Sequence, residues 1–199
     1  YTFLASIFWG VPQPLFFNQI KFIPAIEIAF HRGLWSFVFL LIIIIILGRI
    51  KEFFHIFKSS KKVIILSITS ILITVNWTGF ILAVSFNRVQ DASMGYYMTP
   101  MISIVLGYIF LNEKISLLKL ISVLMMFSSL IFLFINLKTL PLLAILIGTT
   151  WGVYGLLRKQ VKVSSEIGLL YESGFISLFA APYLIFLGFN GSGHFINDT

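Results

Sequence analysis

The chain has 199 residues, of which 59% are hydrophobic and only 11% are charged, and it contains no cysteine. A soluble domain would be about half apolar and about a quarter charged, so this composition excludes a soluble globular protein, and the lack of cysteine excludes disulfides and thiolate metal sites. The net charge of +7 lies in short, scattered loops, a distribution that indicates membrane topology and argues against a nucleic-acid partner.

Seven apolar segments occupy nearly all of the chain. A helix needs about 20 mostly apolar residues to cross roughly 30 Å of hydrocarbon, and the segments lack the alternation of barrel strands. We therefore expect an all-α fold, a polytopic membrane helix bundle. The expected spans are residues 3–17, 28–47, 63–86, 92–111, 115–137, 140–157 and 167–189. Because the chain begins inside an apolar segment and without methionine, we expect its true start to lie upstream.

The lysines and arginines predict the orientation, because positively charged short loops stay on the cytoplasmic side. The loops after the second, fourth and sixth spans carry ten of them, namely Arg49, Lys51, Lys58, Lys61, Lys62, Lys114, Lys119, Arg158, Lys159 and Lys162. The opposite face has only Lys21, Arg88 and Lys138, with Arg32 just inside a helix. We therefore expect a cytoplasmic amino terminus.

A weak internal repeat relates the two parts of the chain. The dipeptide at residues 9–10 returns at 151–152, and the dipeptide at 27–28 returns at 166–167. If the repeat begins again at the sixth helix, each unit has five helices, and an odd number inverts the second unit relative to the first. We expect residues 1–137 to form the first repeat and residues 138–199 to hold two helices of the second and an exit loop.

Charged residues within the spans are costly in lipid and usually face a cavity or a partner. Arg32 and Glu172 lie at comparable depths and could pair, or bind opposite ends of a zwitterionic substrate. The alternatives are an interfacial anchor for Arg32 and a structural partner for Glu172. Glu172 and His31 are also candidates for proton coupling, whereas Glu113 ends the fourth helix and is expected to be structural.

Polar and aromatic residues in the middle of spans are further candidates for a substrate cavity. Asn76 must find a partner in hydrocarbon, and the neighbouring Trp77 offers a flat stacking surface. Trp9 and Trp151 lie within the first and sixth spans. The alternatives are an interhelical hydrogen bond for Asn76 and helix packing for the tryptophans.

The fourth span carries Tyr96 and Tyr97 shortly before Pro100. A proline at 100 cannot donate the backbone bond that residue 96 would accept, and such breaks are tolerated where protein or a water cavity satisfies the backbone. We expect a kink at Pro100 with both tyrosines in a substrate wall, the alternative being a simple packing kink. Pro12 is expected to distort the first helix similarly.

These residues together resemble the RarD-type permeases of the EamA group within the drug/metabolite transporter superfamily. The resemblance covers essentially the whole chain and rests on residues 8–10 (FWG), 27–36 (EIAFHRGLWS), 76–77 (NW), 92–100 (ASMGYYMTP), 106–107 (LG), 110–113 (FLNE), 154–156 (YGL) and 158–159 (RK). It implies a ten-helix transporter of the bacterial inner membrane, built of two inverted five-helix repeats around a central cavity, with both termini cytoplasmic. This chain stops after seven expected helices.

The sequence favours a secondary transporter over an intramembrane enzyme. The only aspartates, Asp91 and Asp198, lie near loops, and no nucleophile motif, metal-binding motif or P-loop is present. Energy would then come from exchange or an ion gradient. The expected partners are a small-molecule substrate, the lipid bilayer and, as a candidate assembly, a second copy in a homodimer; no cofactor, metal or nucleic acid is expected. A truncated, non-transporting membrane subunit is the remaining alternative.

Overall fold

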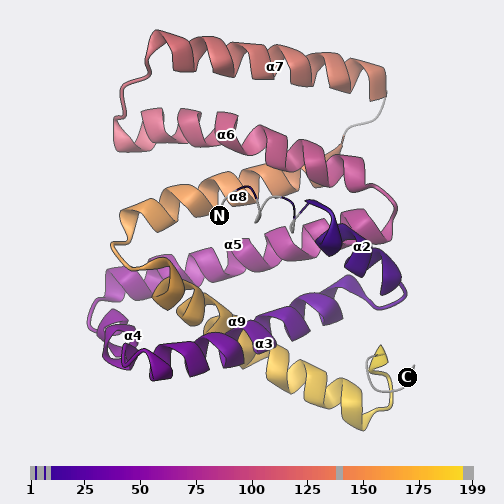
Figure 1. The fold of residues 1–199 in the computed structure, drawn as a ribbon, viewed down its shortest axis with the longest axis vertical. Coiled ribbons are helices and arrows are strands. Elements are labelled where there is room, and N and C mark those ends of the chain that lie inside the picture. Colours follow the sequence, from indigo (N-terminus) through magenta and orange to yellow (C-terminus); the bar gives the residue numbers. More distant parts are fainter. Residues whose placement is uncertain (1–2, 4–6, 8–9, 138–140, 195–199) are drawn as a thin grey trace.

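The described part of the computed structural model, residues 3, 7, 10–137 and 141–194, folds entirely into helices and connecting turns (Figure 1). This confirms the expected all-α helix bundle. The helices are α2 (Pro12–Gln19), α3 (Ala25–Ile46), α4 (Ile50–Ile56), α5 (Ser60–Ser85), α6 (Val89–Leu111), α7 (Leu117–Leu137), α8 (Leu142–Gln160) and α9 (Ser165–Phe189).

Four of these helices, α3, α5, α6 and α9, are long and apolar enough to cross a membrane by length and composition. A further apolar stretch, Leu117–Leu133 of α7, is shorter. The first expected span, 3–17, lies partly outside the described residues. Helix α8 has 19 residues and ends in a basic turn with Arg158 and Lys159, so its last turn continues past the expected boundary at residue 157.

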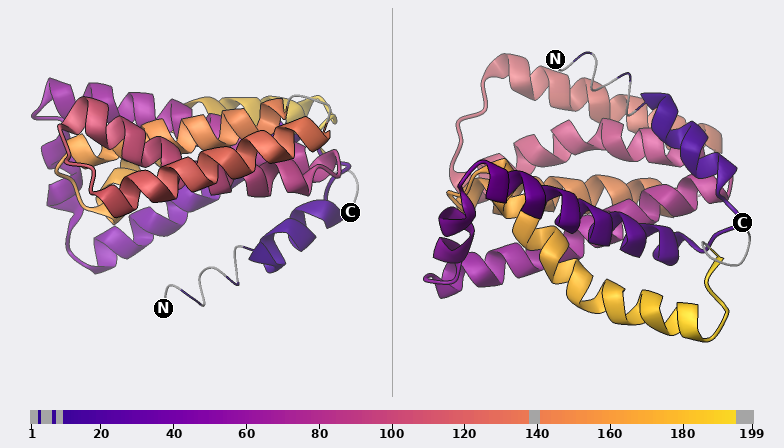
Figure 2. Two further views of the ribbon diagram at one scale, coloured as in Figure 1. Left: turned by 90° about the horizontal axis from the view of Figure 1, so that it is seen from above. Right: turned by 60° about the horizontal axis from the view of Figure 1, so that its bottom comes forward.

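The core of the bundle is formed by α8 between α5 and α6, with α3 packed across α9 (Figure 1). Helix α7 lies at the edge of the bundle, beyond α6, and the views in Figure 2 show α9 crossing beneath α3. The loops 47–49, 57–59, 112–116 and 161–164, which carry Arg49, Lys58, Lys114 and Lys162, gather at one end of the bundle, the left in Figure 1. We call this the basic end.

Glycines allow α6 and α8 to approach closely. A Cβ atom at Gly95 would lie 2.8 Å from the carbonyl oxygen of Ala144, and one at Gly148 would lie 2.8 Å from the carbonyl oxygen of Gly95. Backbone atoms cannot rotate away as a side chain can, so only glycine fits at these two crossing points. Small residues at helix interfaces are a general device for close packing in membranes.

Two prolines have different positions in their helices. Pro12 is the first residue of α2, where a missing backbone N–H costs nothing. Residues 7 and 10 before it are helical as well, and Val11 directly before Pro12 leaves the helical conformation (φ −120°), so the expected distortion of the first helix at Pro12 stays a prediction. Pro100 lies inside α6, which continues to Leu111 and ends at Asn112 in the left-handed conformation (φ 53°).

The short helix α4 was not expected from the sequence. It lies at the basic end between α3 and α5, and its Ile56 is buried with residues of α5 and α9. The ring of Phe57, just after α4, lies 5.7 Å from that of Tyr171. Seven residues are too few to form a span, so α4 covers the basic end of the α3–α9 pair.

Candidate functional site

A cavity of about 290 Å³ opens between α2, α3, α5, α6 and α8. Side chains from five helices converge on it, although they are far apart in the sequence. Its lining consists of Gly10, Gln13, Pro14, Arg32, Trp77, Phe80, Val89, Ser93, Tyr96 and Trp151. Four of the residues expected at a substrate site, Arg32, Trp77, Tyr96 and Trp151, therefore meet at one cavity.

Arg32 supplies the charge at this cavity. Its guanidinium carbon lies 4.1 Å from the ring centroid of Trp77, and the electron-rich face of an indole attracts a cation. No salt bridge joins Arg32 to a carboxylate of the described residues. The wall of the cavity thus carries a positive group that is held by an aromatic ring.

Asn76 takes the structural role that was its alternative. Its side chain is fully buried and donates to the carbonyl of Ile147 at 2.9 Å and to the hydroxyl of Thr150 at 3.1 Å. Its own amide oxygen accepts a bond from the Tyr96 hydroxyl at 3.4 Å. Asn76 therefore connects α5 to α8 and helps to hold Tyr96 at the cavity, but it does not line the cavity.

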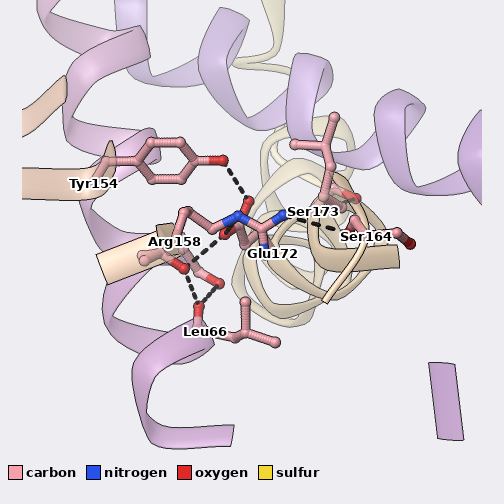
Figure 3. A network of polar contacts seen from close by, with 9 residues as sticks. Leu66, Tyr154, Arg158, Ser164, Glu172 and Ser173 are labelled. Carbon is pink, nitrogen blue, oxygen red and sulfur yellow. Dashed lines mark hydrogen bonds and ion pairs between the residues drawn. The ribbon is translucent and has the colours of Figure 1, made fainter. Parts of the chain in front are cut away.

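Glu172 is the centre of a second polar cluster, shown in Figure 3. Its side chain is fully buried. The Thr69 hydroxyl donates to Oε1 at 2.6 Å, the Tyr154 hydroxyl donates to Oε2 at 3.1 Å, and Nε of Arg158 lies 3.6 Å from Oε1. The cationic partner of Glu172 is therefore Arg158 and not Arg32, which corrects the expected pairing.

Arg158 is held between α8 and the beginning of α9. Its Nη2 donates to the carbonyl oxygen of Ser164 at 3.4 Å, and its guanidinium lies against the backbone of Gly168, where a Cβ atom would collide with it. The Nη1 atom is buried and has no hydrogen-bond partner in the described part of the chain. Sequence reasoning missed this role because Arg158 was counted among the basic loop residues.

Two stacked rings lie between the cavity and the Glu172 cluster. Trp151 and Tyr154 are parallel within 13°, with ring centroids 5.0 Å apart. Trp151 also meets Tyr96 edge to face at 6.4 Å. The residues at 151, 154 and 158 share one face of α8 because of their i, i+3, i+7 spacing, a signal that could have connected Arg158 to the site.

Further ion pairs occur at the basic end. Lys159 pairs with Glu113, and this contact lowers the pKa of the Glu113 carboxyl. Arg49 pairs with Glu52 at 2.7 Å and lies 3.8 Å from Glu166. The hydrogen bond from Arg49 likewise lowers the pKa of Glu52. These pairs join α6 to α8 and the α3–α4 turn to α9.

A different arrangement is found at the opposite end of the bundle. Glu27, in the first turn of α3, is buried, and His194 donates to it through its backbone N–H at 3.1 Å, with Nδ1 also 3.1 Å from the carboxylate. Glu27 and His31 line a groove of about 520 Å³ between α3 and α9. His31 therefore faces a different space from Arg32, the next residue along the helix.

The remaining sequence candidates lie elsewhere. Tyr97 is 46% exposed and is not among the residues that line the cavity with Tyr96. Trp9 lies outside the described residues. Within the described part of the chain, no group of three or more His, Cys, Asp or Glu side chains could hold a metal ion.

Comparison with known proteins places the chain in a family. The model of the EamA-like transporter family matches residues 1–135. The chain is 36% identical over 191 residues to the uncharacterized transporter YojE of Bacillus subtilis, covering 94% of this chain and 64% of that protein. It is 34% identical over 183 residues to an uncharacterized transporter of Vibrio cholerae, covering 92% of this chain and 60% of that protein.

RarD proteins are among the relatives as well. The chain is 31% identical over 192 residues to the protein RarD of Escherichia coli, covering 96% of this chain and 64% of that protein. The chain thus spans less than two thirds of the length of these curated relatives. No solved structure matches it. The chain belongs to the EamA-like transporter family, and within that family it is similar to the RarD proteins.

Proposed function

We propose that this chain belongs to a secondary transporter that moves a small solute across the bacterial inner membrane, driven by exchange or by an ion gradient. The observation that supports this most directly is the cavity beside Arg32, which brings one cation and several aromatic rings together from four helices, α3, α5, α6 and α8. Such transport needs no catalytic step. The amino terminus would be cytoplasmic, so the basic end would face the cytoplasm.

Alternating access requires a site that opens to one side while the other side is closed. Between the cavity and the basic end lie the Trp151–Tyr154 stack and the Glu172–Arg158 pair. We therefore assign this conformation to a state that is closed toward the cytoplasm. Opening would separate α8 from α9, which breaks the contact of Arg158 with Glu172.

The polar contacts across this closure suit a reversible gate. The exposed pair between Lys159 and Glu113 joins α6 to α8, so separation of α8 from α9 would leave it intact. The buried pair of Arg158 and Glu172 would be costly to break unless each partner gained water or another partner. Entry of water or solute from the cytoplasmic side would supply those partners, which couples opening to occupancy.

Counterflow in proteoliposomes tests the proposal. Vesicles that contain the protein are loaded with an unlabelled solute, and uptake of the same labelled solute is followed for a panel of aromatic acids, amino acids and neutral aromatic amides. We expect accumulation of at least one class above that in protein-free vesicles. Uptake equal to that of protein-free vesicles for the whole panel contradicts a transport function.

A further inference from the structure

We infer that the cavity beside Arg32 selects an organic anion with a flat apolar body, such as an aromatic carboxylate. This inference rests on the proposed transport function for its biological meaning, but the binding site itself can be tested without transport. It replaces the zwitterionic substrate that the sequence suggested.

The preference for an anion follows from the charges around the cavity. Among the described residues that line it, Arg32 is the one charged side chain, and the other polar groups are neutral: the side chains of Gln13, Ser93 and Tyr96 and the indole N–H groups of Trp77 and Trp151. A guanidinium has five N–H donors and no acceptor. The guanidinium carbon of Arg32 lies 4.1 Å from the Trp77 ring centroid, and a cation held by an aromatic ring in this way can still donate its N–H groups to an oxygen ligand.

Among the described residues, no carboxylate lines the cavity to bind the positive end of a zwitterion. Glu172 is already bonded to Thr69, Tyr154 and Arg158, and the Trp151–Tyr154 stack lies between it and the cavity. Asp91, in the first turn of α6, pairs with Arg88 at 2.6 Å. The negative groups near the site are therefore neutralised by their own cations.

The lining and the volume of the cavity determine which kind of ligand fits in it. Trp77, Phe80, Tyr96 and Trp151 present rings from α5, α6 and α8, and such rings favour flat, apolar groups. A volume of about 290 Å³ lies at the lower end of the range of roughly 300–1,000 Å³ that is usual for small-molecule sites. A single-ring or two-ring acid matches both the size and the walls.

An anionic oxygen group could also come from a lipid headgroup. A free aromatic acid and an anionic phospholipid share the chemistry that Arg32 would recognise, a charged oxygen group next to an apolar body. We commit to the soluble acid because aromatic rings from α5, α6 and α8 line the cavity beside the cation. The test therefore includes vesicles with and without an anionic lipid.

The experiment measures binding of radiolabelled phenylacetate to the protein by scintillation proximity, in vesicles of phosphatidylcholine. Unlabelled phenylacetate, its neutral amide, phenethylamine and phenylalanine serve as competitors. We expect phenylacetate to compete at least about tenfold better than the other three. Competition by the amide, the amine or phenylalanine equal to that by phenylacetate, or no saturable binding of phenylacetate, overturns the inference.

Substitutions test whether Arg32 binds phenylacetate. Arg32→Gln should weaken phenylacetate binding at least about tenfold, while Arg32→Lys, which keeps the charge, should retain part of it. Lys21→Gln removes one charge from an exposed turn at the same end of the bundle and should leave binding unchanged. If Arg32→Gln, with the thermal stability of the wild type, binds phenylacetate as the wild type does, the inference is wrong.

Two further results separate the site from the transport function. Arg32-dependent phenylacetate binding without counterflow of any solute supports the site and contradicts transport. Counterflow of a neutral or cationic solute that Arg32→Gln leaves unchanged supports transport and overturns the site. Phosphatidylglycerol in mixed vesicles could displace phenylacetate from the wild type but not from Arg32→Gln. That result assigns the site to a lipid headgroup and overturns the soluble ligand.

Discussion

Trp151 and Tyr154 stack with their ring centroids 5.0 Å apart, and each belongs to a different polar cluster. Trp151 lines the cavity that contains Arg32, whereas the Tyr154 hydroxyl donates to Glu172. One turn of α8 therefore connects a positively charged cavity to a buried carboxylate. Movement of this turn would change both clusters together.

The buried carboxylate should matter far more to transport than the exposed one. Glu172→Gln leaves Arg158 without a counter-charge in a side chain that is only 13% exposed, and loss of one partner of a buried pair is strongly destabilising. We expect counterflow to fall by at least about tenfold, measured at matched protein amounts in vesicles.

Glu113→Gln is the matched control for that change. It removes the same charge from an exposed pair with Lys159 at the basic end, and such pairs contribute little. We expect less than about a twofold change in counterflow. Equal activity of the Glu172 and Glu113 variants would refute a role for the buried cluster.

The crossing of α6 and α8 should not tolerate a methyl group. In Gly148→Ala the new Cβ would lie 2.8 Å from the carbonyl oxygen of Gly95, so the helices must separate, and overpacking of this kind costs about 1–3 kcal/mol. Gly155→Ala, on the same helix, meets nothing within 4 Å and serves as the control. Thermal unfolding in detergent should show a lower midpoint for Gly148→Ala alone; identical midpoints would rule out the close crossing.

The pair between Lys159 and Glu113 should make a pH-dependent contribution to stability. Lys159 lowers the pKa of the Glu113 carboxyl below its ordinary value of 4.5. A lowered carboxyl pKa stabilises the folded state above the ordinary pKa, and the effect is lost as the pH falls through the lowered pKa. The midpoint difference between wild type and Glu113→Gln should therefore be constant near neutral pH and disappear in acid. A difference that grows on acidification would contradict this pairing.

The absence of cysteine makes the orientation directly measurable. A single cysteine at Ser60, at the basic end, should react with a membrane-impermeant maleimide only after the cells are permeabilised. One at Ser192, beyond α9 at the opposite end, should react in intact cells. The reverse pattern would invert the topology that the basic loops predict.

Much of the cavity could be predicted from the sequence, because polar and aromatic residues in apolar spans have few uses other than a cavity or a helix contact. Arg32, Trp77, Tyr96 and Trp151 were expected on this ground and meet at the cavity. Tyr97 was expected with Tyr96, but adjacent residues on a helix point about 100° apart. The structure accordingly leaves Tyr97 exposed.

The partners of the buried acids could not be predicted in this way. Arg158 was assigned to a loop because positive charges near span ends usually fix topology, but α8 continues to Gln160 and carries Arg158 back toward Glu172. The contact of Glu27 with His194 joins residues 167 positions apart, and no local pattern signals it. Tertiary contacts of this kind depend on how α3 and α9 cross.

The most direct test of the central claim, that the cavity beside Arg32 holds the solute, is substrate protection of a single cysteine at Ser93. Ser93 is exposed on α6 and lines the cavity. We predict that a membrane-impermeant maleimide labels this cysteine from the side opposite the basic end, and that phenylacetate slows the labelling while its amide does not. Labelling that phenylacetate leaves unchanged, in protein that exchanges phenylacetate by counterflow, would contradict the account.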